Sequence, residues 1–189
     1  MLPLLRQQKD GEECLSLSDF VKPCGTDYVG AFAVTAGRGI EEIISGYQQT
    51  DDFKALLYQS LSDRLAEAAA ELLHARVRRE VWGYAPDEWI DRQRALRAQY
   101  RGIRPAAGYP SLPDQSAIFA IEKIVGFANV GIAVTPNGAM SPASSVSGLM
   151  IAHPASRYFM IGAIAPDQRR DYAARRGITE EELSKWLPK

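Results

Sequence analysis

The sequence predicts a single α+β domain over residues 1–189. A short apolar run near residue 30 predicts a buried strand, and a long amphipathic segment after residue 50 predicts a helix. The remaining strands and helices do not alternate strictly, which favours α+β over a doubly wound parallel sheet. The length suits one domain, and a hydrophobic content of 46% is enough to bury a core.

The first half of the chain supplies the buried strand and the main helix. Tyr28–Thr35 (YVGAFAVT) is apolar and β-branched, as a buried strand requires. From Asp51 to Val81 the pattern is helical and would be roughly 45 Å long, the spine of the domain. The side chains expected to face the core recur three or four residues apart: Phe53, Leu57, Leu61, Leu65, Ala69, Leu72 and Leu73.

The middle of the chain predicts a second helix and then a rigid loop. Gly83 and Pro86 end the long helix, and Asp87–Tyr100 is a second, arginine-rich helical segment. The next stretch, Gly102–Asp114 (GIRPAAGYPSLPD), holds three prolines and is neither helix nor central strand. A short helix is expected over Ser116–Val125.

The last part of the chain predicts a hairpin and two closing helices. Ser144–His153 and Arg157–Ile164 are strand-like and are joined by the turn signal HPAS, which favours an antiparallel pair. Helix boundaries are indicated at the end of the chain by Pro166, Gly177 and the capping box of Thr179 with Glu182.

Composition narrows the possible functions. Lys plus Arg (22) nearly balances Asp plus Glu (23), so no overall cationic field favours nucleic acid. No apolar run approaches the ~20 residues of a membrane helix, and the first residues lack the pattern of a secretory signal. With only Cys14 and Cys24 and no zinc-type spacing, neither a disulfide framework nor a metal site is predicted. We therefore expect a cytoplasmic protein that binds neither nucleic acid nor membrane.

Two motifs have competing interpretations. Gly37-Arg-Gly39 between a strand and a helix resembles a dinucleotide turn, but Glu42 occupies the third glycine position and its carboxylate would repel a pyrophosphate. A turn eased by glycine is the favoured interpretation. His74, in the long helix, is expected to be partly buried or at the surface.

The proline-rich loop is the best candidate site. Pro105 biases the backbone of Arg104 to extended geometry, and a guanidinium suits a carboxylate held by two hydrogen bonds. Gly108 allows a ligand close to the main chain, and Tyr109 offers an aromatic face with a hydroxyl. The same residues would suit a structural corner whose arginine pairs with a surface acid, and residue types alone leave both open.

Eight arginines concentrate between residues 76 and 104, opposed by only four acids. This stretch suits either docking of an acidic partner or a solvated helix face. The eight arginines are Arg76, Arg78, Arg79, Arg92, Arg94, Arg97, Arg101 and Arg104.

Several blocks, in order along nearly the whole chain, resemble the C-terminal activation domain of cobalamin-dependent methionine synthase. They are SDFV, DYVGAFAVT, DRLAEA, RVRREVWGYAPDE, YRGIRPAAGYPSLPD, SSVSGLMIAHPASRYF and DYAARRG. The resemblance implies a helmet- or C-shaped domain with a bent antiparallel sheet flanked by helices. It also implies binding of S-adenosylmethionine and reductive methylation of cob(II)alamin, which is held by a separate cobalamin-binding domain. Flavodoxin or a related reductase would supply the electron, in a cytoplasmic methyltransferase of methionine biosynthesis.

The resemblance carries roles over to particular positions of the loop. Arg104 would bind the ligand carboxylate, and Ala106 and Gly108 would add main-chain contacts. Tyr109 would reach toward the cobalt face as the catalytic residue, and Tyr158 would contact the ligand as well.

On the long helix, Glu67 would hold the ammonium side of the ligand. Asp63, one turn earlier, would receive the cobalt-ligating histidine of the cobalamin domain.

The chain also departs from the family pattern. The family domain usually begins with a further stretch carrying an acidic ligand contact. That stretch, and the folate, homocysteine and cobalamin domains, are expected to be missing here. Gln115 stands where the family often has a histidine. The chain would therefore act as a fragment or in trans, and would not be catalytic without the cobalamin domain. The alternative is a truncated interaction module that docks on a corrinoid protein or flavodoxin without binding S-adenosylmethionine.

Overall fold

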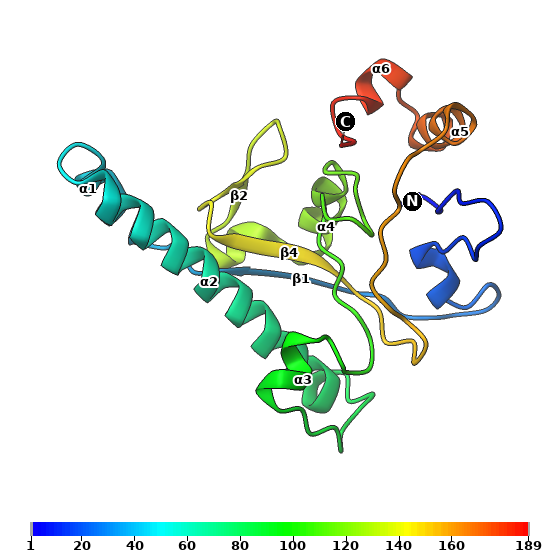
Figure 1. The fold of residues 1–189 in the computed structure, drawn as a ribbon, viewed down its shortest axis with the longest axis horizontal. Coiled ribbons are helices and arrows are strands. Elements are labelled where there is room, and N and C mark those ends of the chain that lie inside the picture. The colour runs from blue at the N-terminus through cyan, green and yellow to red at the C-terminus, as the bar shows by residue number, and fades with distance from the viewer. Residues whose placement is uncertain (1, 189) are drawn as a thin grey trace. The chain divides into compact units, whose positions relative to one another are not determined.

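The long helix α2 spans Asp52–Arg76 in the computed structural model, which describes residues 2–188 (Figure 1). Asp51 caps it by accepting from the Lys54 amide, a bond that lowers the pKa of the Asp51 carboxyl. One π-helical turn, Val77–Val81, follows and ends the helical segment where the sequence predicted.

The face of α2 that packs inward is not the predicted leucine stripe. The buried positions carry small or polar side chains: Ala55, Ser62, Ala66, Ala70 and His74. Most of the predicted stripe is exposed instead, including Phe53, Leu57, Leu61, Leu65 and Leu72. His74 is fully buried rather than partly buried or at the surface. Small side chains let the helix backbone approach its neighbours closely, so apolar periodicity alone selected the wrong face.

The predicted glycine-eased turn is confirmed: it connects strand β1 (Gly30–Thr35) to helix α1 (Ile40–Gln48). Gly39 caps α1 with a φ of 78°, and a Cβ on Gly37 would lie only 2.2 Å from the Pro142 side chain. Gly37 is therefore explained by packing against Pro142.

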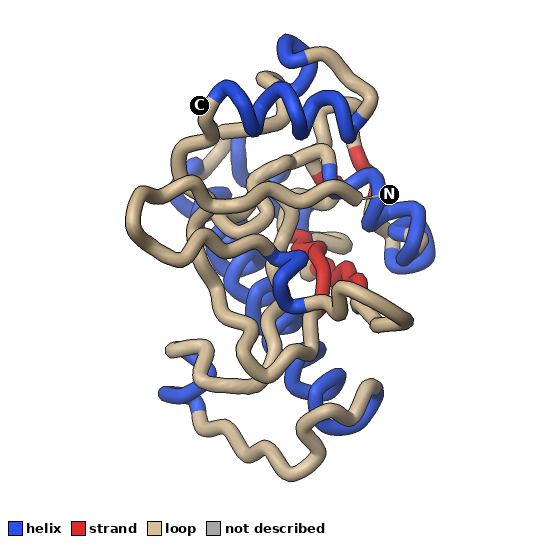
Figure 2. The backbone as a smooth tube through the Cα atoms, turned by 90° about the vertical axis from the view of Figure 1, so that its right-hand side faces the viewer, coloured by secondary structure: helices blue, strands red, loops and turns tan. Residues whose placement is uncertain are grey.

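The strands are short, as the red segments of Figure 2 show. They form two two-stranded sheets. In one, β1 pairs with β4 (Ser145–Met150), and the Ala36 amide donates to the Ser144 carbonyl, so the two strands run antiparallel. In the other, β2 (Ala133–Val134) pairs antiparallel with β3 (Met140–Ser141).

Helix α3 is much shorter than the predicted helix over Asp87–Tyr100. It spans only Arg92–Leu96 and contains no buried residue. Without an apolar face to pack, a helix of this length gains no tertiary support, and the chain leaves it at Ala98 with a φ of 50°.

The chain divides into two compact units. The first comprises Met1–Gly30, Arg101–Ile121 and Gly148–Lys189, and the second comprises Ala31–Tyr100 and Glu122–Ser147. Helix α4 (Ala117–Val125), expected from the sequence, begins in the first unit. The closing helices α5 (Pro166–Arg176) and α6 (Glu180–Leu183) also lie in the first unit. Pro166 and Gly177 bound α5 as predicted, and the Thr179 side chain caps α6 by accepting from the Glu182 amide.

A core in the first unit joins residues distant in sequence: Leu5, Ile161, Tyr172, Ala173, Leu183 and Leu187. The N-terminal segment is therefore packed down through Leu5.

The predicted hairpin between Ser144–His153 and Arg157–Ile164 does not form. The HPAS turn is present, since the Ser156 amide donates to the His153 carbonyl, but residues 157–164 form no strand. The partner of β4 is β1, more than 100 residues earlier in the chain.

Candidate functional site

The proline-rich loop runs beside the end of β4 in the first unit. Ile103 and Ile151 exchange backbone hydrogen bonds of 3.0 and 2.9 Å, and the Leu149 amide donates to the Pro105 carbonyl at 2.9 Å. Arg104 thus lies on an extended segment held on both sides by main-chain bonds. Its side chain leaves a fixed backbone, as the sequence indicated.

Two glycines let this loop pack. A Cβ on Gly148 would lie 2.3 Å from the Pro105 carbonyl oxygen and 2.8 Å from Ala106 Cα, so only glycine fits beside the loop. Gly108 has a φ of 82°, and a Cβ there would meet Gln115 Oε1 at 2.0 Å. Gln115, which departs from the family pattern, therefore packs against the turn at Gly108.

The structure brings Arg104 and Tyr158 together. The Tyr158 hydroxyl accepts a hydrogen bond from the Arg104 backbone amide at 2.9 Å. Close by, the Ile161 amide donates to the Pro110 carbonyl, so the segment after β4 lines the loop. Tyr158 and Tyr109 are about half exposed (41% and 52%), which leaves aromatic surface for a ligand.

The turn at the tip of the loop is closed by its own backbone. The Gly108 amide donates to the Leu112 carbonyl at 2.9 Å, and the Tyr109 amide donates to the Ala106 carbonyl at 3.2 Å. Ala106 is buried, whereas Gly108 is exposed. Four predicted ligand-contact positions of the loop, Arg104, Ala106, Gly108 and Tyr109, therefore belong to one ordered segment.

A buried ionic cluster holds the far end of the loop. The Asp114 carboxylate accepts from Tyr172 Oη at 2.8 Å and from Arg176 Nη1 at 2.6 Å, and it also accepts from the Ser116 amide. Burial, followed by the negative charge of Asp114, raises the pKa of the Tyr172 hydroxyl well above its usual value. Tyr172 therefore remains a neutral donor to Asp114, and the loop is tied to α5.

The two predicted carboxylates of the second unit lie one turn apart on α2. Asp63 Oδ1 accepts from Ser144 Oγ at 2.6 Å and from Gln59 Nε2 at 2.8 Å. Within residues 2–188, Asp63 Oδ2 has no hydrogen bond. Glu67 is half-buried on the same side of the helix as Asp63.

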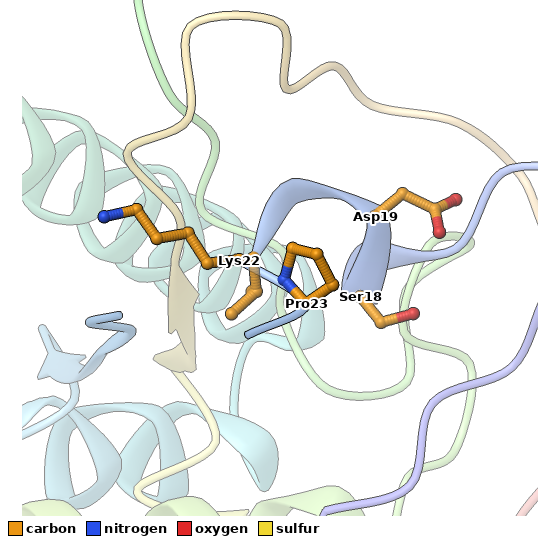
Figure 3. Close-up of a pocket in the computed structure, with 5 residues that line it drawn as sticks. Ser18, Asp19, Lys22 and Pro23 are labelled. Carbon is orange, nitrogen blue, oxygen red and sulfur yellow. The ribbon is translucent and has the colours of Figure 1, made fainter. Parts of the chain in front are cut away.

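A further cavity of about 590 Å³ lies in the first unit, around the turn Leu17–Phe20 (Figure 3). Its lining residues are Ser18, Asp19, Val21, Lys22 and Pro23, none of which the sequence predicted as a site residue. Asp19 is paired with Arg6, whose hydrogen bonds lower the pKa of the Asp19 carboxyl. Figure 3 shows the Lys22 ammonium pointing away from Asp19. This cavity offers few convergent polar groups.

Between residues 2 and 188, no group of three or more His, Cys, Asp or Glu side chains could hold a metal ion. None of the helices described is long and apolar enough to cross a membrane.

Sequence reasoning did not single out several residues that position the site. Gly148 had a usable signal, because an isolated glycine inside a strand marks close backbone approach. The residues that fix the two carboxylates lie 58 to 81 positions from them in the sequence. Ser144 fixes Asp63, and Tyr172 and Arg176 fix Asp114. No local pattern identifies pairs at that separation.

The chain is similar to known proteins of one family. The family model of the vitamin B12-dependent methionine synthase activation domain matches residues 1–177. A crystal structure of the MetH reactivation domain bound to AdoHcy is 40% identical to this chain, with a TM-score of 0.90. The match covers 97% of this chain and 58% of that chain. The chain thus spans little more than half the length of this relative. It belongs to the family of vitamin B12-dependent methionine synthase activation domains.

Proposed function

We propose that this chain binds S-adenosylmethionine at the loop Gly102–Asp114 and supports reductive methylation of cob(II)alamin. The observation that carries the proposal is the rigid loop on which Arg104 is held and hydrogen bonded to Tyr158. The AdoHcy bound to the MetH relative supports it, because S-adenosylhomocysteine differs from S-adenosylmethionine only by the transferable methyl group and its charge.

The residues of the loop suit this ligand chemically. The guanidinium of Arg104 can hold the amino-acid carboxylate with two parallel hydrogen bonds. Gly108 is exposed, so the ligand can approach its main chain on the side that Gln115 does not cover. The exposed rings of Tyr109 and Tyr158 provide apolar faces with polar tips. Bound S-adenosylmethionine supplies the methyl group, and the cobalamin of a separate domain and an electron from flavodoxin or a related reductase complete the proposed reaction.

The carboxylates of α2 have separate proposed roles. Glu67 would balance the positive charge of the ligand's ammonium group. Asp63 would accept a hydrogen bond from the histidine that leaves cobalt in the cobalamin domain. Gln59 and Ser144 support this role, because they orient Oδ1 and leave Oδ2 for the incoming imidazole.

Isothermal titration with S-adenosylmethionine tests the proposal. Losing the ion pair with the carboxylate in Arg104→Ala should weaken binding by about 1.5–3 kcal/mol, or about ten- to a hundredfold. Arg157→Ala is the matched control, since Arg157 adjoins Tyr158 but is exposed and pairs with Glu13. Equal affinity of wild type and Arg104→Ala would refute the site assignment. No binding by a folded wild-type chain would favour the alternative, an interaction module that does not bind this ligand.

A further inference from the structure

Three side chains meet beside the middle of α2, and each is hydrogen bonded to the other two. Ser144 Oγ and Gln59 Nε2 both donate to Asp63 Oδ1, at 2.6 and 2.8 Å, and Gln59 Nε2 also donates to Ser144 Oγ at 3.0 Å. Gln59 lies one turn before Asp63 on the same helix, whereas Ser144 lies 81 positions later in the sequence, directly before β4. Ser144 is therefore the member of this group that comes from outside α2.

The backbone of Ser144 is fixed at the end of β1. Its carbonyl accepts from the Ala36 amide at 2.9 Å and from the Thr35 hydroxyl at 3.2 Å. The residue is only 4% exposed, so its hydroxyl is shielded from water that would compete for Asp63. Ser62 of α2 donates to the carbonyl of the same Ala36, so the helix and the turn are held at a fixed separation.

The two donors occupy one oxygen of the carboxylate and leave the other open. Asp63 is exposed, and in the part of the chain that the structure describes its Oδ2 accepts no hydrogen bond. An ionised carboxylate is a hydrogen-bond acceptor only, so the open oxygen suits an N–H donor and disfavours a second acceptor. The Ser144 proton is already directed at Oδ1, so this hydroxyl offers an incoming group no donor of its own.

We propose that Ser144 is a positioning residue for Asp63: its buried hydroxyl fixes the carboxylate so that Oδ2 meets an imidazole N–H of the partner domain. The inference rests on the proposed function, in which Asp63 accepts the histidine that leaves cobalt. A hydrogen bond from a hydroxyl to a carboxylate at 2.6 Å is of the strong, charge-assisted kind. It fixes the aspartate before the partner arrives, so binding does not have to order this side chain.

The test is isothermal titration of the whole chain with a cobalamin-binding domain of methionine synthase that holds cob(II)alamin. Ser144→Ala should weaken binding by about three- to tenfold, the effect of one hydrogen bond, because the Asp63 carboxylate is then free to turn. Ser144→Thr keeps the hydroxyl and should restore the affinity to within about twofold of the wild-type value.

Ser145→Ala is the matched control. The Ser145 hydroxyl donates to Thr35 Oγ1 and to the Pro142 carbonyl rather than to Asp63, so its loss removes local hydrogen bonds without freeing the carboxylate. Binding should therefore be retained in this variant. Equal weakening by Ser144→Ala and Ser145→Ala would overturn the inference, because both changes would then act through the stability of the turn.

A double-mutant cycle separates this inference from the proposed role of Asp63. Asp63→Asn should weaken binding at least about tenfold, and adding Ser144→Ala should cause no further loss, because the two residues act as one group. Additive losses would overturn the positioning role, as would wild-type affinity of Ser144→Ala beside weak binding of Asp63→Asn. Wild-type affinity of Asp63→Asn, or no binding by the wild-type chain, would overturn the role of Asp63 itself and this inference with it.

Discussion

Replacing Gly148 by alanine should detach the candidate ligand loop from its strand. The new Cβ would stand 2.3 Å from the Pro105 carbonyl oxygen and 2.8 Å from Ala106 Cα, and both are backbone atoms that cannot rotate away. Relief requires the segments to separate by about 1 Å, and such overpacking costs about 1–3 kcal/mol. The adjacent Leu149–Pro105 hydrogen bond would stretch from 2.9 Å and lose most of its contribution of about 1 kcal/mol. The expected loss in the free energy of unfolding is about 2–4 kcal/mol.

Urea denaturation followed by circular dichroism measures this loss, with Gly46→Ala as the control. A Cβ on Gly46 meets no atom within 4 Å, and Gly46 lies inside α1, so its replacement should stabilise by about 0.5–1 kcal/mol. Gly148→Ala should also bind S-adenosylmethionine at least about tenfold more weakly, because Arg104 is displaced with the loop. A free energy of unfolding of Gly148→Ala within about 0.5 kcal/mol of the wild-type value would refute the argument that the loop backbone lies too close to Gly148 for a Cβ.

Three further predictions follow from the packing. Asp114→Asn leaves the Arg176 charge without its buried partner, and urea unfolding should show a loss of about 3–5 kcal/mol. Since the pKa of Tyr172 is raised in the folded state, its stabilising contribution is complete below pH ~10 and is lost as pH rises further. Tyr172→Phe should therefore lose less stability than wild type between pH 9 and 11, and identical slopes would contradict the linkage. Leu65→Ser should change the free energy of unfolding by less than about 0.5 kcal/mol, because Leu65 is exposed. Ala70→Leu should lower it by about 1–3 kcal/mol, because Ala70 is fully buried. A larger loss for Leu65→Ser than for Ala70→Leu would show that the leucines form the buried face.

Features governed by local rules were predictable from the sequence. Pro166 and Gly177 bound α5, and Thr179 caps α6, because these residues satisfy helix ends without help from the rest of the fold. The proline-rich loop was identified for the same reason, since Pro105 restricts the Arg104 backbone directly.

Features set by distant partners were not predictable. The HPAS turn forms, yet residues after it hydrogen bond to Arg104 and Pro110 rather than to β4. The backbone of β4 is already bonded to β1 and, through Ile103 and Pro105, to the proline-rich loop. On α2, Ser62 donates to the Ala36 carbonyl and thereby turns the small-residue face inward. Apolar periodicity reflects hydrophobicity alone and not such close backbone approach, so it predicts the leucine face of α2 as the buried one. The roles of Glu67 and Asp63 rest on family resemblance, because spacing alone does not distinguish them from surface acids.

The core shared by Leu5, Leu183 and Leu187 bears on how the protein is made. On the ribosome, the core of the first unit cannot be completed until the segment with Leu183 and Leu187 has emerged, so Leu5 and its neighbours remain without these partners until then. During this interval the second unit holds nearly all of its sequence and can form first. A protease that removes a few residues around either Leu5 or Leu187 would open the same core, so damage at one end should loosen the other.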